Sequence, residues 1–470
     1  MPQIADIFEA LSGHRPNLGQ TLVTHATHDS RLAREGSLFV ALKGESVDGH
    51  DYVDHAFSQG AVAALVEQEM SSDINCVDLV MGQQLSVAKN KYPLCIRTKS
   101  SLASLQDIAQ FWRSKLNIQV IGITGSVGKT TSKEMIYKVL AHKHSVIKSE
   151  GNYNNEIGLP LSIIGIDETH EFAVLEMGFY VPGEIALLAK IAQPQIGVLS
   201  TVGLVHAERA GSQVAIFEGK SELVQALPKH GTAILNRDDP LVVKMAERTL
   251  ADVLFYGVDE SADLKVSDIN GLGLEGVEFV LHFAGEEKAA KVPMLGKHSV
   301  YTALRAAAVG LVIGMSLDDI VPILETGIAD VRLSASYSKN GAKLLNDTYN
   351  ASPQSTLAAL QLLDEVPGRK IAVLGDMLEL GRYETEGHAS VGEAVADIAD
   401  LLVTIGSRAE TIAESAEEKG LANDAIHRFA DSDAALNFLR QNIEGTDVLL
   451  VKGSRAMQME NIVPELEALP

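Results

Sequence analysis

The stretch "VIGITGSVGKTTSKEM", residues 120–135, decides the fold. An apolar run ends in glycines, and a lysine, two threonines and a segment of helical period follow. A buried strand that turns into a helix in this way directs several backbone N–H groups and the positive end of the helix dipole at one place, where phosphate oxygens can bind. Lys129 adds a full charge and Thr130 a hydroxyl that can bind Mg²⁺. The sequence therefore predicts a nucleotide triphosphate site, made by Thr124, Gly125, Ser126, Val127, Gly128, Lys129, Thr130 and Thr131.

Short apolar runs separated by helical segments continue on both sides of this turn. They predict buried parallel strands at 118–123, 172–176, 196–200, 232–236, 343–346, 370–375, 401–406 and 448–453. A change to a period of two within 253–295 predicts an inserted antiparallel patch. The fold class that we expect is α/β with three domains: a small N-terminal α/β domain (1–102), a central P-loop parallel-sheet ATPase domain (103–325) and a C-terminal Rossmann-like domain (326–470).

Composition narrows the classes of partner. The 470 residues carry a formal net charge of -23, which argues against nucleic acid and anionic membranes as partners. Cys76 and Cys95 are too few for a disulfide framework and suit a reducing compartment. No apolar run reaches the roughly 20 residues that span a bilayer, and the first residues do not resemble a signal peptide. We therefore expect a cytoplasmic protein without membrane insertion.

Three polar residues downstream of the turn are candidates for holding a metal ion. Glu176 ends the apolar run "FAVLE", where a carboxylate from a neighbouring strand could bind the metal of a phosphate site. His206 and Lys220 are weaker candidates by themselves, because a single histidine or helix lysine is usually solvated or structural.

Two classes of nucleotide protein compete at this point. Asn236, in "ILNRDDP" (234–240), begins a pattern that GTPases use to read guanine, so a P-loop nucleotide switch is one alternative. Such a switch also needs an Asp-x-x-Gly turn, and the only aspartate between Lys129 and Arg237 is Asp167, with no glycine at that offset. An enzyme makes better use of two additional α/β domains, which can close on the nucleotide.

Several motifs, in order along the chain, resemble the Mur ligases of peptidoglycan synthesis. They are "DSRLAREGSLFVALKGESVDGHD" (29–51), "TGSVGKTTSKEM" (124–135), "GNYNNEIGLPLS" (151–162), "LEMGFYVPGEI" (175–185), "NDTYNASPQS" (346–355), "VLGDMLELG" (373–381) and "VKGSRAMQMENIV" (451–463). The glycine spacing, with Ile123 in place of a glycine, is typical of this family.

The resemblance implies an ATP-dependent ligase that joins the carboxylate of a UDP-N-acetylmuramoyl-tripeptide to the amine of D-Ala-D-Ala, for cell-wall growth, cell shape and division. It implies that Thr130, Glu176, His206 and a carbamylated Lys220 hold Mg²⁺. It also implies a monomer, and it leaves open whether the tripeptide ends in diaminopimelate or lysine. The catalytic residues expected from the resemblance are Lys129, Asn155, Lys220, His206 and Arg332. The nucleotide would also meet Asn236, Arg332 and Asp347, and the substrate residues are Ser30, Arg31, Lys43, Gly44, Asn154, Asn155, Tyr349 and Asn350.

The sequence departs from the family pattern around the adenine. Ser299 and Thr302 stand where relatives commonly have asparagines, and Ser352 replaces a further asparagine. These departures bear on adenine packing and nucleotide preference. The nearest alternative function is another ligase of the same superfamily that adds a different amino acid or dipeptide.

Overall fold

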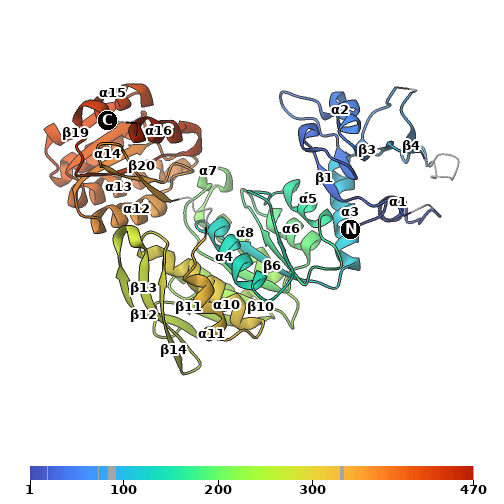
Figure 1. Cartoon of the computed structure of the whole chain (residues 1–470), viewed down its shortest axis with the longest axis horizontal. Coiled ribbons are helices and arrows are strands. Elements are labelled where there is room, and N and C mark those ends of the chain that lie inside the picture. Colours follow the sequence, from blue (N-terminus) through green and yellow to red (C-terminus); the bar gives the residue numbers. More distant parts are fainter. Residues whose placement is uncertain (18–19, 72, 83–90, 329–332, 469–470) are drawn as a thin grey trace.

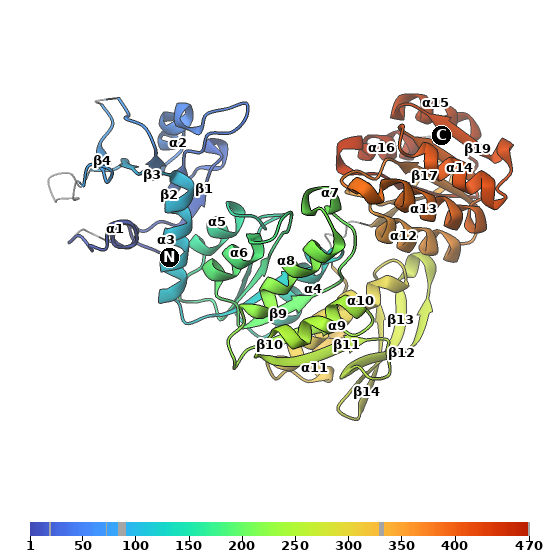
Figure 2. The ribbon, with the colours of Figure 1, turned by 180° about the vertical axis from the view of Figure 1, so that it is seen from behind.

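The structure of the protein is a computed structural model that describes residues 1–470 except 18–19, 72, 83–90, 329–332 and 469–470. Its elements form three lobes in chain order, with the central lobe between the other two (Figures 1 and 2). The lobes contain sheets of five, nine and six strands, respectively. The predicted α/β class with three domains is confirmed.

The N-terminal domain is built on a parallel sheet in the order β1-β2-β3-β5-β4. The strands are β1 (His25–Thr27), β2 (Ser37–Val40), β3 (Ala61–Val66), β4 (Cys76–Asp78) and β5 (Leu94–Arg97). Its helices are α1 (Ile4–Ser12) and α2 (Val53–Ser58). Every residue of β2 and all but one of β3 are buried, as expected of parallel strands covered on both faces.

Helix α3 (Ser101–Lys115) joins the N-terminal and central domains. The Arg113 guanidinium donates to the carbonyl oxygens of Leu116, Ile118 and Ala192, and Trp112 Nε1 donates to the Ile166 carbonyl. These bonds tie the helix to the central domain. The predicted boundary between 102 and 103 falls inside this helix, and the residue bounds of the three domains stay predictions.

The central sheet has the order β14-β13-β12-β11-β10-β9-β6-β8-β7. Its strands are β6 (Gln119–Thr124), β7 (Val146–Lys148), β8 (Phe172–Glu176), β9 (Ile196–Leu199), β10 (Thr232–Asn236), β11 (Asp252–Gly257), β12 (Leu264–Gly271), β13 (Val277–Phe283) and β14 (Glu286–Val292). The antiparallel patch begins later than its predicted start near 253, because β11 and the start of β12 still pair in parallel. Only β12 with β13, and β13 with β14, are antiparallel.

Helices cover the central sheet and complete its core. They are α4 (Lys129–Ala141), α5 (Gly158–Ile164), α6 (Glu184–Ala192), α7 (Ala207–Ala210), α8 (Gln213–Gln225), α9 (Pro240–Lys244), α10 (Val300–Val312) and α11 (Leu317–Leu324). The apolar stripe of α4, residues Met135, Ile136, Val139 and Leu140, is buried in the same apolar cluster as α10. Within the described part of the chain, no helix is long and apolar enough to cross a membrane.

The C-terminal sheet has the order β15-β16-β20-β17-β18-β19, parallel except for β15. Its strands are β15 (Ser334–Tyr337), β16 (Lys343–Asn346), β17 (Arg369–Gly375), β18 (Leu401–Ile405), β19 (Ile426–Phe429) and β20 (Asp447–Lys452). Its helices are α12 (Pro353–Glu365), α13 (Glu384–Ile398), α14 (Glu410–Lys419), α15 (Ser432–Asn442) and α16 (Ile462–Glu467). The carboxyl ends of β16 and β20 lie side by side, which brings the loops that follow them together.

Candidate active site

The glycine turn lies between β6 and α4 and is shaped by two left-handed glycines. Gly125 has φ 146° and Gly128 has φ 82°, a region that favours glycine. A Cβ atom on Gly125 would lie 1.8 Å from Ser200 Oγ, so only glycine fits against the end of β9. Ser126 N donates to the Thr201 carbonyl at 2.8 Å, which ties the turn to the neighbouring loop. The turn is thus a rigid cradle at the N-terminus of α4.

Lys129 is the first residue of α4. Its Nζ donates to the Gly125 carbonyl at 2.8 Å, so the ammonium folds back over the turn. The N-terminus of α4 and this charge act at the same place and favour an anion there. The local field is positive although the chain as a whole is strongly acidic.

Glu176 ends β8, the strand next to β6, and stands opposite Ile123 in the register. Its side chain is almost completely buried. Oε2 accepts a hydrogen bond from Thr130 Oγ1 at 2.9 Å, and Oε1 accepts one from Asn154 Nδ2 at 2.9 Å. A hydroxyl and a carboxylate therefore meet beside the cradle, and oxygen atoms of this kind are the ligands that Mg²⁺ prefers.

His206 and Lys220 lie around the same turn. Burial lowers the pKa of His206, and Lys129 lowers it further, while Glu379 opposes the shift. Burial lowers the pKa of Lys220 well below its usual value, and the charge of Lys129 adds to this effect. Lys220 Nζ stands 5.1 Å from the centre of the Phe179 ring. A buried amine with such a pKa is held toward its neutral, nucleophilic form.

His206 also makes a contact between domains that the sequence did not predict. Its Nδ1 pairs with Glu379 Oε2 from the C-terminal domain, and Glu208 N donates to the Glu379 carbonyl at 3.0 Å. Both His206 and Glu379 have φ 63°, which costs about 1–2 kcal/mol for a residue with a side chain. Such backbone conformations persist only where the surrounding structure imposes them, so the packing around His206 and Glu379 fixes this pair. Glu379 lies in the quoted motif "VLGDMLELG", but nothing in that motif indicates its partner.

A second unpredicted contact lies at the carboxyl ends of β16 and β20. The buried Lys452 donates to Asp347 Oδ2 at 2.5 Å and to the Asn350 carbonyl at 2.9 Å. Lys452 ends β20, and Asp347 directly follows the neighbouring parallel strand β16. Their contact could therefore have been predicted from the sequence. The Arg455 guanidinium lies 5.5 Å from the centre of the Tyr349 ring in the same loop cluster. Arg332 lies outside the described residues.

The remaining residues predicted for the nucleotide and the substrate carboxylate are engaged within the protein. Asn155 Oδ1 accepts from Gly158 N at 2.8 Å and so caps α5. Asn236 is buried and donates from Nδ2 to the Ser200 carbonyl at 3.0 Å. In the "ILNRDDP" stretch, Asp238 accepts from Val258 N and Asp239 accepts from Leu241 N, so these aspartates organise loops. Nothing in these contacts favours the switch.

The residues predicted for the uridine diphosphate lie in the N-terminal domain. Ser30 Oγ pairs with His55 Nδ1 at 3.0 Å, and Gly44 N donates to the Val47 carbonyl at 2.9 Å next to the exposed Lys43. Arg31 is exposed and pairs with Asp29 at 2.6 Å. The side-chain hydrogen bond from Arg31 is the largest cause that lowers the pKa of Asp29 to about 2.

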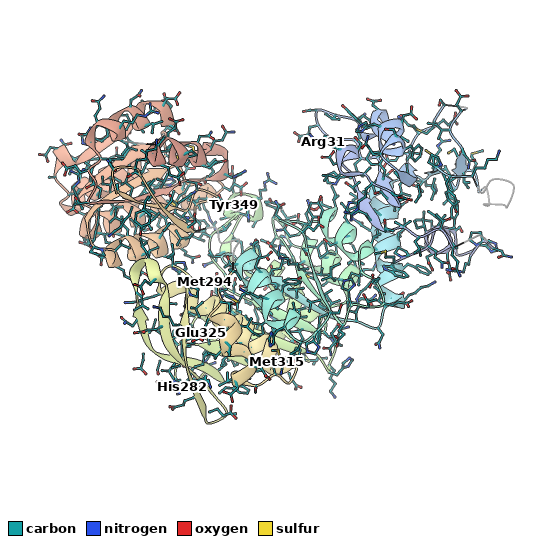
Figure 3. The ribbon with its side chains drawn as sticks, viewed as in Figure 1. Arg31, His282, Met294, Met315, Glu325 and Tyr349 are labelled. Carbon is teal, nitrogen blue, oxygen red and sulfur yellow. The ribbon has the colours of Figure 1, made fainter. Side chains whose placement is uncertain are left out.

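The predicted residues thus fall into three groups on three lobes. Figure 3 shows Arg31 on the N-terminal lobe and Tyr349 where the C-terminal lobe meets the central one. The phosphate cradle, Glu176, His206 and Lys220 belong to the central lobe between them. The structure does not bring the diphosphate group and the Tyr349 group together. The ligand contacts of all these residues stay predictions.

Three family models match: "Mur ligase family, catalytic domain" over residues 22–110, "Mur ligase middle domain" over 123–310 and "Mur ligase, glutamate ligase domain" over 332–455. The UDP-N-acetylmuramoyl-tripeptide-D-alanyl-D-alanine ligase of Bacillus subtilis is 34% identical, with 99% of this chain and 98% of the relative covered. The Escherichia coli enzyme of the same name is 31% identical, again with 99% and 98% covered.

Solved structures also resemble this chain over nearly its full length. The chain resembles a MurF from Acinetobacter baumannii with a TM-score of 0.85 and 28% identity, covering 99% of each chain. It also resembles a MurF ligase from Thermotoga maritima in complex with ADP, with a TM-score of 0.80, 30% identity and coverage of 96% of this chain and 98% of that chain.

Proposed function

Because this chain belongs to the Mur ligase family, we infer that it is an ATP-dependent ligase that joins UDP-N-acetylmuramoyl-tripeptide to D-alanyl-D-alanine. The observation that carries this function is the full-length match to relatives with this activity, together with a phosphate cradle flanked by Thr130 and Glu176. The relatives from Bacillus subtilis, Synechocystis and Escherichia coli, which are 31–34% identical, all carry this one name, and none of them favours another Mur-type ligase or a nucleotide switch.

The reaction needs ATP because a carboxylate has no leaving group that an amine can displace. One carboxylate oxygen of the tripeptide attacks the γ-phosphorus, the bond to the β-γ bridging oxygen breaks, and ADP leaves. The acyl phosphate is then attacked by the amine of D-Ala-D-Ala, and inorganic phosphate leaves with the former carboxylate oxygen as the amide forms. The amine loses a proton in this step.

The residues of the cradle act mainly by position and charge. The backbone N–H groups of 125–130 and the Lys129 ammonium offset the negative charge on the γ-phosphoryl oxygens. Lys129 already lies over the turn through its bond to Gly125, so little reorganisation is needed. We propose that Asn154, whose side chain donates to Glu176, helps to orient the incoming carboxylate.

The side chains present fit Mg²⁺. Thr130 Oγ1 and Glu176 Oε2 are oxygen donors already 2.9 Å apart, and His206 and a modified Lys220 would complete the set. When bound, Mg²⁺ would neutralise charge on the β- and γ-phosphates. Within the described residues no group of three or more His, Cys, Asp or Glu gathers to hold a metal.

We propose that Lys220 is carbamylated. A protonated lysine would repel a divalent cation, whereas burial and Lys129 favour the neutral amine. The neutral nitrogen adds to CO₂ and releases one proton, giving a carbamate anion with two oxygen atoms. This anion would offset the charge of Lys129 and add to the negative charge of Glu176.

Substrate binding would join the three lobes. We propose that Ser30, Arg31, Lys43 and Gly44 bind the diphosphate, and that Tyr349 and Asn350 take part in binding D-Ala-D-Ala. Asp347, held by Lys452, would accept hydrogen bonds from ribose hydroxyls, and Arg332 would neutralise phosphate charge. One chain would hold all three substrates, so we propose a monomer that acts in the cytoplasm, where ATP and nucleotide-linked precursors are found.

Glu379 provides a test of the coupling between the C-terminal domain and the proposed metal site. Changing Glu379 to alanine leaves His206 without its partner on Nδ1 and is expected to lower ligation about 10–100-fold and to raise the Mg²⁺ concentration needed for half-maximal rate. Glu379→Gln keeps an acceptor and should recover part of the loss. Glu417→Ala, which breaks an exposed pair with Arg428, is the control. An unchanged Mg²⁺ requirement in Glu379→Ala would mean that His206 needs no support from this domain.

The proposed function is tested by phosphate release over a matrix of UDP-muramoyl peptides and amines. We expect release only when ATP, a UDP-linked tripeptide and D-Ala-D-Ala are all present. Release that requires a different amine would identify another Mur-type ligase. Nucleotide hydrolysis that is indifferent to both substrates would contradict a ligase and favour the switch. Tripeptides ending in diaminopimelate or lysine in the same matrix determine the third residue.

A further inference from the structure

Arg305 is a buried cation that the mechanism above does not use. It lies on α10 within an otherwise apolar stretch, and only 4% of it is exposed. A guanidinium stays charged under all ordinary conditions, so its burial is costly unless partners or opposite charge offset it. The packing of α10 against α4 places this charge next to the phosphate cradle.

All the hydrogen-bond partners of Arg305 are neutral hydroxyls. Nε donates to Ser132 Oγ at 2.6 Å, Nη2 to Thr302 Oγ1 at 3.3 Å and Nη1 to Tyr256 Oη at 3.4 Å. Ser132 Oγ in turn donates to the Gly128 carbonyl at 2.5 Å. A Cβ on Gly128 would lie 2.9 Å from Nη2, so the guanidinium lies directly against the last residue of the turn. Arg305 thus supports the cradle through Ser132.

A comparison with Arg113 shows what is unusual about this arginine. Arg113 is equally buried, but its guanidinium is surrounded by four backbone carbonyl oxygens, which carry partial negative charge. Arg305 has no ion pair with any carboxylate in the described part of the chain. Its charge therefore adds to that of Lys129 and of the helix dipole, rather than being cancelled where it lies.

Two positive charges, those of Lys129 and Arg305, therefore lie against the turn before ligand binds, and Glu176 is the carboxylate in contact with Thr130. A polyphosphate is an anion that both positive charges attract. Thr302 accepts from this same guanidinium, so Thr302 and the buried charge belong to one local arrangement.

We propose that Arg305 is a positioning residue that holds the phosphate loop through Ser132 and strengthens binding of the nucleotide phosphates through its field, without contributing to recognition of the adenosine part. This inference rests on the proposed ATP-dependent function. It explains why a permanent charge is kept in the apolar interface between α4 and α10.

The test compares ligands with different numbers of phosphates. We would measure the Kd of ATP, ADP, AMP and adenosine for the wild type and for Arg305→Met, which has a similar length and no charge. We expect the Kd of ATP and ADP to rise about tenfold or more, that of AMP to rise less, and that of adenosine to stay unchanged. The KM for ATP should rise while kcat at saturation changes less than about threefold. Arg305→Lys should recover part of the phosphate-dependent loss.

Two further variants separate positioning from stability. Ser132→Ala keeps the charge but removes the link to Gly128, and we expect a smaller increase in the Kd of ADP. This variant tests the proposal even if Arg305→Met does not fold. Arg113→Met is the matched control: it should lower the melting temperature without changing the ratio of ADP to adenosine affinity.

Three results would overturn the proposal. They are equal losses for adenosine and ADP in Arg305→Met, unchanged ADP binding in a folded Arg305→Met, or unchanged ADP binding in Ser132→Ala. Failure of the wild type to bind ATP or ADP would instead overturn the proposed function, so the two failures are distinguishable.

Discussion

Lys220→Ala is expected to lower the rate of ligation at least about 100-fold, because it removes the proposed carbamate from the metal site. The side chain is buried on α8 beside Phe179, and the variant leaves an apolar cavity there. Binding of ADP to the cradle should weaken much less, because Lys129 and the N-terminus of α4 are kept. Phosphate release with saturating substrates is the measurement, with ADP affinity measured on the same sample.

Chemical rescue distinguishes a carbamate from a lysine that acts as an amine. Acetate or another short carboxylic acid should restore part of the activity of Lys220→Ala, because it can enter the cavity and supply a carboxylate. Methylammonium should not. Lys220→Met, which fills the space, should be as inactive and should resist rescue by acetate. If methylammonium restores activity and acetate does not, Lys220 works as a cation and the carbamate hypothesis is wrong.

The carbamate can also be observed without an activity assay. Wild-type protein incubated with ¹³C-labelled bicarbonate should give a carbamate resonance that is missing from Lys220→Ala. Lys133→Ala is the comparison, because Lys133 is also buried but donates to the Gly151 carbonyl at 2.6 Å. The same resonance in Lys220→Ala would place the modification on another lysine.

The sequence predicted most of the parallel strands because each is a short apolar run buried on both faces. The runs at 172–176 and 232–236 coincide with β8 and β10. The predicted start of the antiparallel patch was wrong, because the spacing of apolar residues does not reveal which neighbour a strand pairs with. Most residues of β11 are only partly buried, yet β11 pairs in parallel with β10.

The residues of the candidate site could be predicted where their positions follow from the end of a strand or the start of a helix. A strand-end acid such as Glu176 falls beside the turn because β8 neighbours β6, and Thr130 follows from its place on α4. The contacts of Glu379 with His206 and of Arg305 with Ser132 each join residues 173 positions apart. Such pairs depend on how domains and helices pack, which no local pattern in a single sequence encodes.

Lys129→Met is expected to have the other large effect, a loss of ligation of at least about 10³-fold. The ammonium lies over the turn, and methionine keeps its length while removing both the charge and the bond to Gly125. Because negative charge develops on the departing β-γ bridging oxygen in the transition state, kcat should fall more than ATP affinity. Single-turnover phosphate release, with the Kd of ATP measured separately, gives both quantities.

Lys138→Met on the same helix is the matched control for this prediction. Lys138 donates to the Thr326 carbonyl at 3.2 Å near the other end of α4, far from the cradle, so its variant should keep the wild-type rate.

Arginine restores a charge at position 129 but not the compact ammonium, and Lys129→Arg should therefore recover ATP binding more than kcat. A Lys129→Met enzyme that retained the wild-type kcat would show that charge at the head of α4 binds the nucleotide but does not drive phosphoryl transfer.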